Sequence, residues 1–323
     1  MTDPVRVTDL VPLTDRQESV LAALLALQRQ SWEQGVAAHA LLDLGRVDLA
    51  VLLADAAVTR QAADGRLGDV EHDANAVNGA ACGEAVLDAA RRETGSRFAA
   101  AADRQLDWLT DHAPRAADGT LFHLADRREV WADTVYMVVP FLALAGRTDL
   151  AVAQVEGHRR RLHDETTGLY AAIWSEQTGS ATRPQHWGTG NGWVVAAIAR
   201  ALRLVPQWPS GAREHLAGHA RAVLDACLAY RRPDGLFHDV LDDPDTFRET
   251  NVAQMLAYAA KTGAADGWLP PGYADTGRDL LAAATRQVDE LGRVTGACGS
   301  PTFDHPGVSA EAQAFHLLAV AAG

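Results

Sequence analysis

The sequence has little cysteine and no surplus of positive charge, and each shortage excludes a class of protein. Three cysteines in 323 residues cannot form a disulfide framework, and none lies at the spacing of a metal-binding motif. A formal net charge of −13 argues against a nucleic-acid or anionic-membrane partner, because both need a basic surface. No run of about 18 apolar residues is present, so we expect no transmembrane helix.

The start of the chain also lacks the features of an export signal. No basic segment followed by an apolar run occurs in the first seventeen residues. With the unpaired cysteines, this predicts a reduced, cytoplasmic protein. The remaining composition is globular, with 48% hydrophobic and 22% charged residues. No linker-like tract divides the chain, so we expect a single domain over residues 1–323.

What the sequence does contain is alanine and leucine at helical spacing over almost its whole length, while strand-like alternation is scarce. The periodicity predicts twelve helices, over residues 15–30, 34–44, 47–62, 76–92, 96–112, 132–145, 148–162, 191–205, 211–230, 250–261, 272–287 and 308–321. The first pair is expected to turn near residues 30–34. The protein is therefore predicted to be all-α.

A short glycine phrase recurs between the expected helices. Its glycines lie 54, 49, 67 and 57 residues apart, at Gly65, Gly119, Gly168, Gly235 and Gly292. Asp-Gly turns are common in any helical protein, but even spacing and a shared Leu-aromatic sequel favour a repeat. A period of about 50 residues indicates one repeated helical hairpin. Six hairpins predict an (α/α)6 barrel, a closed ring whose long loops gather at one mouth, where a site belongs.

Four segments interrupt the apolar pattern where inner helices of such a ring should begin. They contain tryptophan or clustered polar residues and cover 30–35, 131–137, 186–193 and 248–251. A sugar site needs flat aromatic faces for C–H patches and polar groups for hydroxyls, and these segments supply both. They therefore predict a carbohydrate site at the mouth.

Parts of these segments resemble the unsaturated glucuronyl and rhamnogalacturonyl hydrolases, glycoside hydrolase families 88 and 105. The similar stretches are WEQGV at 32–36, WADTVYM at 131–137, PFLA at 140–143, WGTGNGW at 187–193 and GVSAEAQAF at 307–315. The resemblance implies an (α/α)6 barrel that hydrates the C4=C5 double bond left by a polysaccharide lyase on a terminal uronic acid. A carboxylic acid protonates C4, water adds at C5, and the hemiketal collapses to release the next sugar. The implied partner is a small oligosaccharide, and no metal or organic cofactor is implied.

The resemblance gives the acid/base role to Asp133. A general acid at neutral pH has to keep its proton, and apolar neighbours favour the uncharged form. From the residues alone, Asp133 is equally well a helix N-cap, whose bonds from backbone N–H groups favour the anion. Asp73 is implied as the second carboxylate. Asn75 and Asn78 are alternatives to it, and Asp73 also fits an ordinary solvated loop position.

Further residues are implied to bind substrate. His123 is implied to contact the sugar, although packing on Phe122 is the alternative. The tryptophans are implied to form the aromatic walls of the pocket, with core packing as the alternative: Trp32, Trp187 and Trp193.

Two positions depart from the family pattern. Thr189, in the same motif as Asn191, stands where the family usually has an arginine that is expected to engage the substrate, and Ala172 stands where it has a second histidine. We therefore expect a substrate carboxylate to be held by the start of the helix at 191, or by Arg183 or Arg248. A different substrate is the other explanation.

Three other functions fit parts of the sequence. The same barrel could cleave a saturated sugar, with Asp133 as acid and Asp73 as base, roughly 6.5–9.5 Å apart. A lanthionine-cyclase-like toroid needs zinc ligands that are not spaced here, and a terpene cyclase is suggested only by a DDPD stretch at 242–245 in a turn. A non-catalytic helical scaffold would not need Trp and Asp at the starts of inner helices. No sequence feature predicts an oligomeric state.

Overall fold

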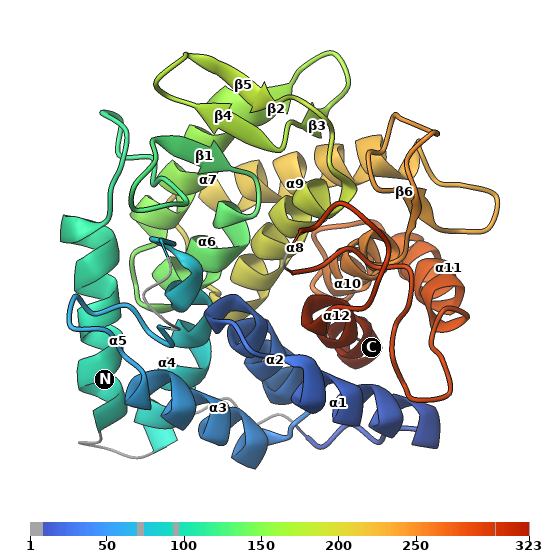
Figure 1. Ribbon diagram of the computed structural model, residues 1–323, viewed down its shortest axis with the longest axis horizontal. Helices are drawn as coiled ribbons and strands as arrows, with labels where there is room; N and C mark the ends of the chain where they lie inside the picture. The colour runs from blue at the N-terminus through green and yellow to red at the C-terminus, as the bar shows by residue number, and fades with distance from the viewer. Residues whose placement is uncertain (1–8, 70–73, 93–96, 301, 323) are drawn as a thin grey trace.

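A ring of paired helices makes up the protein (Figure 1). The computed structural model describes residues 9–69, 74–92, 97–300 and 302–322. Within them six helices form an inner ring: α2 (Ser31–Asp43), α4 (Gly83–Arg92), α6 (Thr134–Leu144), α8 (Gly188–Leu204), α10 (Asn251–Ala265) and α12 (Ala310–Ala321). A 3-10 turn, η1 (Asn78–Cys82), leads into α4. Each inner helix contacts the next, and α12 contacts α2, so the ring is closed.

Six further helices surround this ring. They are α1 (Asp15–Leu27), α3 (Val47–Thr59), α5 (Arg97–Asp107), α7 (Thr148–Leu162), α9 (Ala212–Leu228) and α11 (Tyr273–Thr285). A π-helical turn, η2 (Trp108–His112), continues α5. Outer and inner helices alternate along the chain. Three outer helices each pack on the inner helix that comes just before them: α7 on α6, α9 on α8 and α11 on α10.

The two rings differ in how their sequence is buried. Every residue from Asn251 to Gly263 of α10 is buried, whereas α3 buries only Ala50, Ala54 and Ala57, one stripe at helical spacing. A helix that is buried on all sides belongs inside a protein, and one that buries a single stripe lies on its surface. The predicted (α/α)6 barrel of twelve helices is therefore confirmed in the described part of the chain.

The ends of some helices differ from the prediction. The first hairpin turns earlier than expected, because α1 ends at Leu27 and α2 begins at Ser31. The reason is a capping interaction, in which the carboxylate of Glu33 accepts the backbone N–H groups of Arg29 at 2.6 Å and Gln30 at 2.8 Å.

The repeated glycine phrase forms a similar turn at all five positions, and four of the five share one hydrogen-bond pattern. All five glycines have a positive φ angle, between 75° and 104°. In four of the turns, the glycine N–H donates to the carbonyl of the residue three positions earlier. The N–H of that earlier residue donates in turn to the carbonyl of the residue just after the glycine, as Ala62 does to Arg66 in the first turn. The residue two positions after each glycine is buried: Leu67, Leu121, Tyr170, Phe237 and Val294. The predicted repeat is therefore a structural repeat that anchors each outer-to-inner loop to the core.

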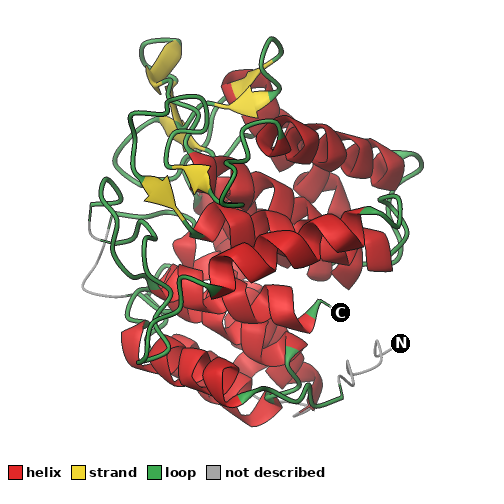
Figure 2. Cartoon of the chain, turned by 90° about the vertical axis from the view of Figure 1, so that its right-hand side faces the viewer, coloured by secondary structure: helices red, strands yellow, loops and turns green. Residues whose placement is uncertain are grey.

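Short strands lie in these loops, and the sequence did not predict them. They are β1 (Glu129–Trp131), β2 (His163–Asp164), β3 (Leu169–Tyr170), β4 (Ile173–Ser175), β5 (Ser180–Arg183), β6 (Phe237–His238) and β7 (Arg248–Glu249). Antiparallel pairing gives one three-stranded sheet, β1-β4-β5, and two two-stranded ones. Figure 2 shows the strands and long loops gathered at one end of the ring.

A buried charged cluster joins three inner helices near the C-terminal ends of α2 and α8. The guanidinium of Arg200 donates to both carboxylate oxygens of Glu84, at 2.6 and 2.7 Å, and lies 3.2 Å from Asp43. Burial lowers the pKa of Arg200, but the two carboxylates outweigh it and hold that pKa well above its usual value. The cluster therefore links α2, α4 and α8 across the ring.

The buried hydrophobic residues form one cluster that extends from Val20 to Ala322. That continuity is what a single domain requires, and the single domain over 1–323 stays a prediction. Among the described helices, none combines the length and the apolar character needed to cross a membrane.

Candidate active site

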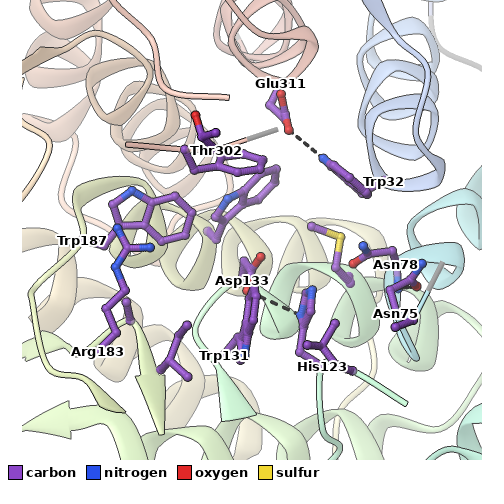
Figure 3. Close-up of a pocket in the computed structure, with 17 residues that line it drawn as sticks. Trp32, Asn75, Asn78, His123, Trp131, Asp133, Arg183, Trp187, Thr302 and Glu311 are labelled. Carbon is purple, nitrogen blue, oxygen red and sulfur yellow. Dashed lines mark hydrogen bonds and ion pairs between the residues drawn. The ribbon is translucent and has the colours of Figure 1, made fainter. Parts of the chain in front are cut away.

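The long loops and the starts of the inner helices enclose a cavity of about 370 Å³. Five of its lining residues are aromatic: Trp32, Trp131, Trp187, Trp193 and Phe303. The polar lining residues include Asn75, Asn78, His123, Asp133, Arg183, Thr302 and Glu311. Figure 3 shows these side chains converging from several helices and loops. The cavity thus combines apolar faces with a few polar groups, as small-ligand sites do.

Asp133 lies at the cavity wall, at the N-cap position of α6. Its side chain accepts no capping hydrogen bond, and its Oδ1 is buried without a hydrogen-bond partner among the described residues. A carboxyl that caps a helix is committed to backbone N–H groups, and this one is not. It is therefore available to a ligand in the cavity.

His123 is held beside this carboxyl from two directions. Its ring stacks on Trp131 with centroids 4.5 Å apart and planes 6° apart. Its Nδ1 lies 2.9 Å from the Thr134 hydroxyl and 3.6 Å from Asp133 Oδ1. Because Trp131 belongs to β1, the small sheet that the sequence did not predict is what orients the imidazole.

The three predicted tryptophans all line the cavity. Trp193 also packs on Tyr136 and Phe315, at centroid distances of 4.7 and 5.1 Å. Trp193 therefore both lines the cavity and packs in the core, so the two predicted alternatives hold together for this residue. Trp32 is partly exposed, and its indole N–H donates to Glu311 Oε1 at 2.6 Å.

Arg183 on β5 also faces the cavity. Its guanidinium carbon lies 5.5 Å from the centroid of the Trp187 ring, within the range of a cation–π contact. Among the described lining residues, it is the one arginine or lysine. The contact with Trp187 places a fixed positive charge beside the aromatic wall.

Three of the residues predicted to bind substrate lie outside the cavity lining. Thr189 is buried, with its hydroxyl 3.5 Å from Cys298 Sγ. Asn191 is also buried, and its amide accepts the Tyr170 N–H at 2.7 Å and donates to the carbonyls of Tyr170 and Trp187, both at 3.0 Å. The amide therefore fixes the backbone beneath the cavity.

Arg248 is exposed on β7, where it donates to Gln287 at 3.0 Å and lies 3.8 Å from Asp234. These contacts hold it on the outer surface. Asp73, the predicted second carboxylate, lies outside the described residues. Its two alternatives, Asn75 and Asn78, both line the cavity.

Glu311 is a carboxyl in the cavity to which sequence reasoning gave no role. It is the second residue of α12, which lies opposite α6 in the inner ring, and Figure 3 shows it across the cavity from Asp133. Burial, together with the nearby charge of Glu33, raises its pKa to about 7, while the bond from Trp32 opposes the change. The cavity therefore holds a second carboxyl, and this one changes its charge near neutral pH.

Two more buried carboxyls lie close behind the cavity. Burial raises the pKa of Asp239 to about 6 and that of Glu249 to about 8. Glu249 accepts the backbone N–H groups of Val252 at 2.7 Å and Cys298 at 3.1 Å, so its role is to hold two segments together. Among the described residues, no group of three or more His, Cys, Asp or Glu side chains is placed to hold a metal ion.

Comparison with known proteins identifies the family. The sequence profile of Glycosyl Hydrolase Family 88 matches residues 13–311. The chain belongs to this family. The predicted resemblance to families 88 and 105 is therefore confirmed, and the match covers nearly the whole stretch over which the motifs lie.

Individual proteins that are similar to this chain agree with this assignment. The unsaturated rhamnogalacturonyl hydrolase YesR of Bacillus subtilis is 28% identical over 232 residues, which cover 68% of this chain and 65% of that protein. The match thus spans less than two thirds of that relative. A possible GH105 member from Salmonella enterica has a TM-score of 0.82 at 17% identity, covering 100% of this chain and 98% of that one. An unsaturated glucuronyl hydrolase specific for heparin has a TM-score of 0.72 at 12% identity, covering 94% and 95%. At such identities the two solved structures establish the shared barrel fold.

Proposed function

We propose that this family 88 protein removes a terminal 4,5-unsaturated uronic acid from lyase-derived oligosaccharides. The observation that carries the proposal is Asp133, a carboxyl without a capping bond, on the wall of a tryptophan-lined cavity. The names of YesR and of the heparin-specific hydrolase support the same class of substrate.

The cavity suits a sugar that carries a negative charge. The indoles of Trp187 and Trp193 offer flat faces for a sugar ring. The inner helices α2, α6, α8 and α12 present their N-terminal ends to the cavity, and the partial positive charge of such ends attracts anions. Arg183 adds a full positive charge, and its guanidinium geometry suits a carboxylate. We propose that Arg183 takes the place of the family arginine that is absent at Thr189.

Asp133 is proposed to act as general acid and then as base. Its carboxyl transfers a proton to C4 of the double bond, and the charge that develops at C5 is met by a water molecule. The carboxylate left on Asp133 then receives a proton from that water, which becomes the C5 hydroxyl. The resulting hemiketal opens, the neighbouring sugar leaves as an alcohol, and Asp133 ends the cycle protonated. His123, 3.6 Å from Asp133, is proposed to orient the carboxyl.

We retain a cytoplasmic location as part of the proposal. Its support is that all three cysteines are free and buried, which fits a reducing compartment. The proposed partner remains a small oligosaccharide, and the predicted absence of a nucleic-acid partner rests on the net charge of −13.

Unsaturated disaccharides prepared with polysaccharide lyases test the proposal. The protein is incubated with glucuronyl and galacturonyl examples, and the ultraviolet absorbance of the double bond is followed. We expect the absorbance to fall while the neighbouring sugar is released. Release of sugar from saturated disaccharides alone, with no reaction of the unsaturated ones, would instead establish a conventional glycosidase and refute the proposal.

A further inference from the structure

Glu311 is a carboxyl that the proposed reaction does not use, although it lines the same cavity as Asp133. It is 3% exposed. Its Oε1 accepts the indole N–H of Trp32, which fixes the carboxyl against the cavity wall. Its Oε2 is buried without a hydrogen-bond partner among the described residues. No arginine, lysine or histidine is paired with Glu311 in the described part of the chain.

We propose that Glu311 makes binding of the anionic substrate depend on pH, because its uncharged carboxyl tolerates a uronate in the cavity and its carboxylate repels one. This inference rests on the proposed function, which places a negatively charged sugar there. It makes Glu311 a residue that selects among substrates by charge, distinct from the acid/base residue on the opposite helix.

The size of the cavity sets the strength of the effect. In a cavity of about 370 Å³ that Glu311 itself lines, a bound carboxylate lies at a separation from Glu311 on the order of 10 Å. Two like charges about 10 Å apart at an effective dielectric constant of about 20 change a binding constant by roughly tenfold or more. Ionisation of Glu311 is therefore expected to weaken binding by at least roughly tenfold.

The groups around Glu311 determine where this change occurs. From α2, Glu33 raises the pKa of Glu311, and the Trp32 indole lowers it. Burial raises the pKa of Glu33 itself, so the two carboxyls compete for protons. In the loop before α12, Cys298 has a raised pKa and stays a neutral thiol.

The other helices that pack on α12 are α1, α10 and α11, and none of them forms an ion pair with Glu311 among the described residues; Arg278 of α11 pairs with Asp275. On α10, Gln254 donates to the Ala312 carbonyl, and Lys261 donates to the Ala319 carbonyl at the opposite end of α12. On α12 itself, burial and the charge of Arg16 on α1 lower the pKa of His316 to about 4, so His316 is neutral near pH 7. The transition is therefore expected near pH 7, where Glu311 loses its proton.

The test is the pH profile of KM and kcat for an unsaturated disaccharide and for its neutral methyl ester. For the wild type, KM for the acid should rise at least roughly tenfold between pH 6 and pH 8.5, while KM for the ester stays flat. Glu311→Gln should abolish the rise, because glutamine can accept the Trp32 bond without ionising. Glu290→Gln, which removes one exposed negative charge outside the cavity, is the control and should keep the wild-type profile.

Two neighbouring variants supply an independent check should Glu311→Gln fold poorly. Glu33→Gln removes the charge that raises the pKa of Glu311 and should move the rise in KM to lower pH. Trp32→Phe removes the opposing bond and should move it to higher pH. A profile unchanged in all three variants, with turnover intact, overturns this inference alone. Absence of turnover at every pH overturns the proposed function together with it.

Discussion

Replacing Arg200 with methionine tests whether the buried charged cluster closes the ring. The side chain is about 1% exposed and contacts Glu84 through two hydrogen bonds and Asp43 through a longer pair. Methionine removes the guanidinium and leaves two carboxyl groups buried between α2, α4 and α8. Breaking a buried ion pair by removing one partner typically destabilises a protein by about 3–5 kcal/mol. Since Arg200 contacts two buried carboxylates, we expect a loss within that range.

The pH dependence of this loss identifies its cause. The two carboxyl groups left behind can be neutralised by protonation at low pH, so the destabilisation should be smaller at pH 5 than at pH 8. Loss of packing alone would be the same at both values. Urea unfolding of Arg200→Met and of the wild type at these two pH values measures the difference directly.

A matched control is available on the surface. Arg278 forms an exposed ion pair with Asp275 on α11, and Arg278→Met should change the free energy of unfolding by less than about 1 kcal/mol. A loss of less than about 1 kcal/mol for Arg200→Met as well, or a loss independent of pH, would show that the cluster does not hold the ring together as described.

Three further predictions follow from the site. Arg183→Met should raise KM for an unsaturated disaccharide about 10–100-fold with little change in kcat, since a bond to a charged group contributes about 1.5–3 kcal/mol; an unchanged KM would exclude the proposed anchor. Asn191→Ala should lower the free energy of unfolding by about 2–4 kcal/mol, as it strands buried backbone groups of Tyr170; urea unfolding measures this, and a loss under 1 kcal/mol would contradict it. Glu249 keeps its proton in the folded state to about pH 8 but ionises near pH 4.5 in the unfolded state. The free energy of unfolding of the wild type should therefore fall between pH 4.5 and pH 8, by about 1.4 kcal/mol per pH unit and a few kcal/mol in all. Thermal unfolding of Glu249→Gln should show a flatter dependence, and an equally steep one would refute the assignment.

Helical periodicity predicted the ring because both kinds of helix leave a clear trace in sequence. Both kinds are rich in apolar residues at helical spacing: α10 is buried on all sides from Asn251 to Gly263, and α3 buries only the stripe at Ala50, Ala54 and Ala57. The glycine phrase gave the number of hairpins, because positive φ is needed at the same point of each turn.

The sequence predicted site residues only where a short motif within one segment points to them. Trp131 and Asp133 share a short motif, but the sheet that holds Trp131 pairs residues 129–131 with 173–175 through strands too short to show alternation. Arg248 looked as promising as Arg183, and the difference is set by β7, which points it toward Gln287 on the outer surface.

The sequence did not predict Glu311 as a site residue for a related reason. A glutamate in the first turn of a helix is an ordinary feature that favours the helix dipole. Its significance comes from Trp32, which is 279 positions away in the chain and reaches it only when the ring closes. Contacts of this range depend on the closed fold and leave no local pattern.

The role of Asp133 as proton donor is tested most directly by a single-turnover experiment. It measures the rate at which the double bond of an unsaturated disaccharide is lost with Asp133→Asn and with the wild type. Asparagine keeps the size of the side chain but cannot donate and recover a proton, so the rate should fall at least about a hundredfold while substrate still binds. A rate within a few-fold of the wild type, in a folded variant, would show that Asp133 is not the proton donor.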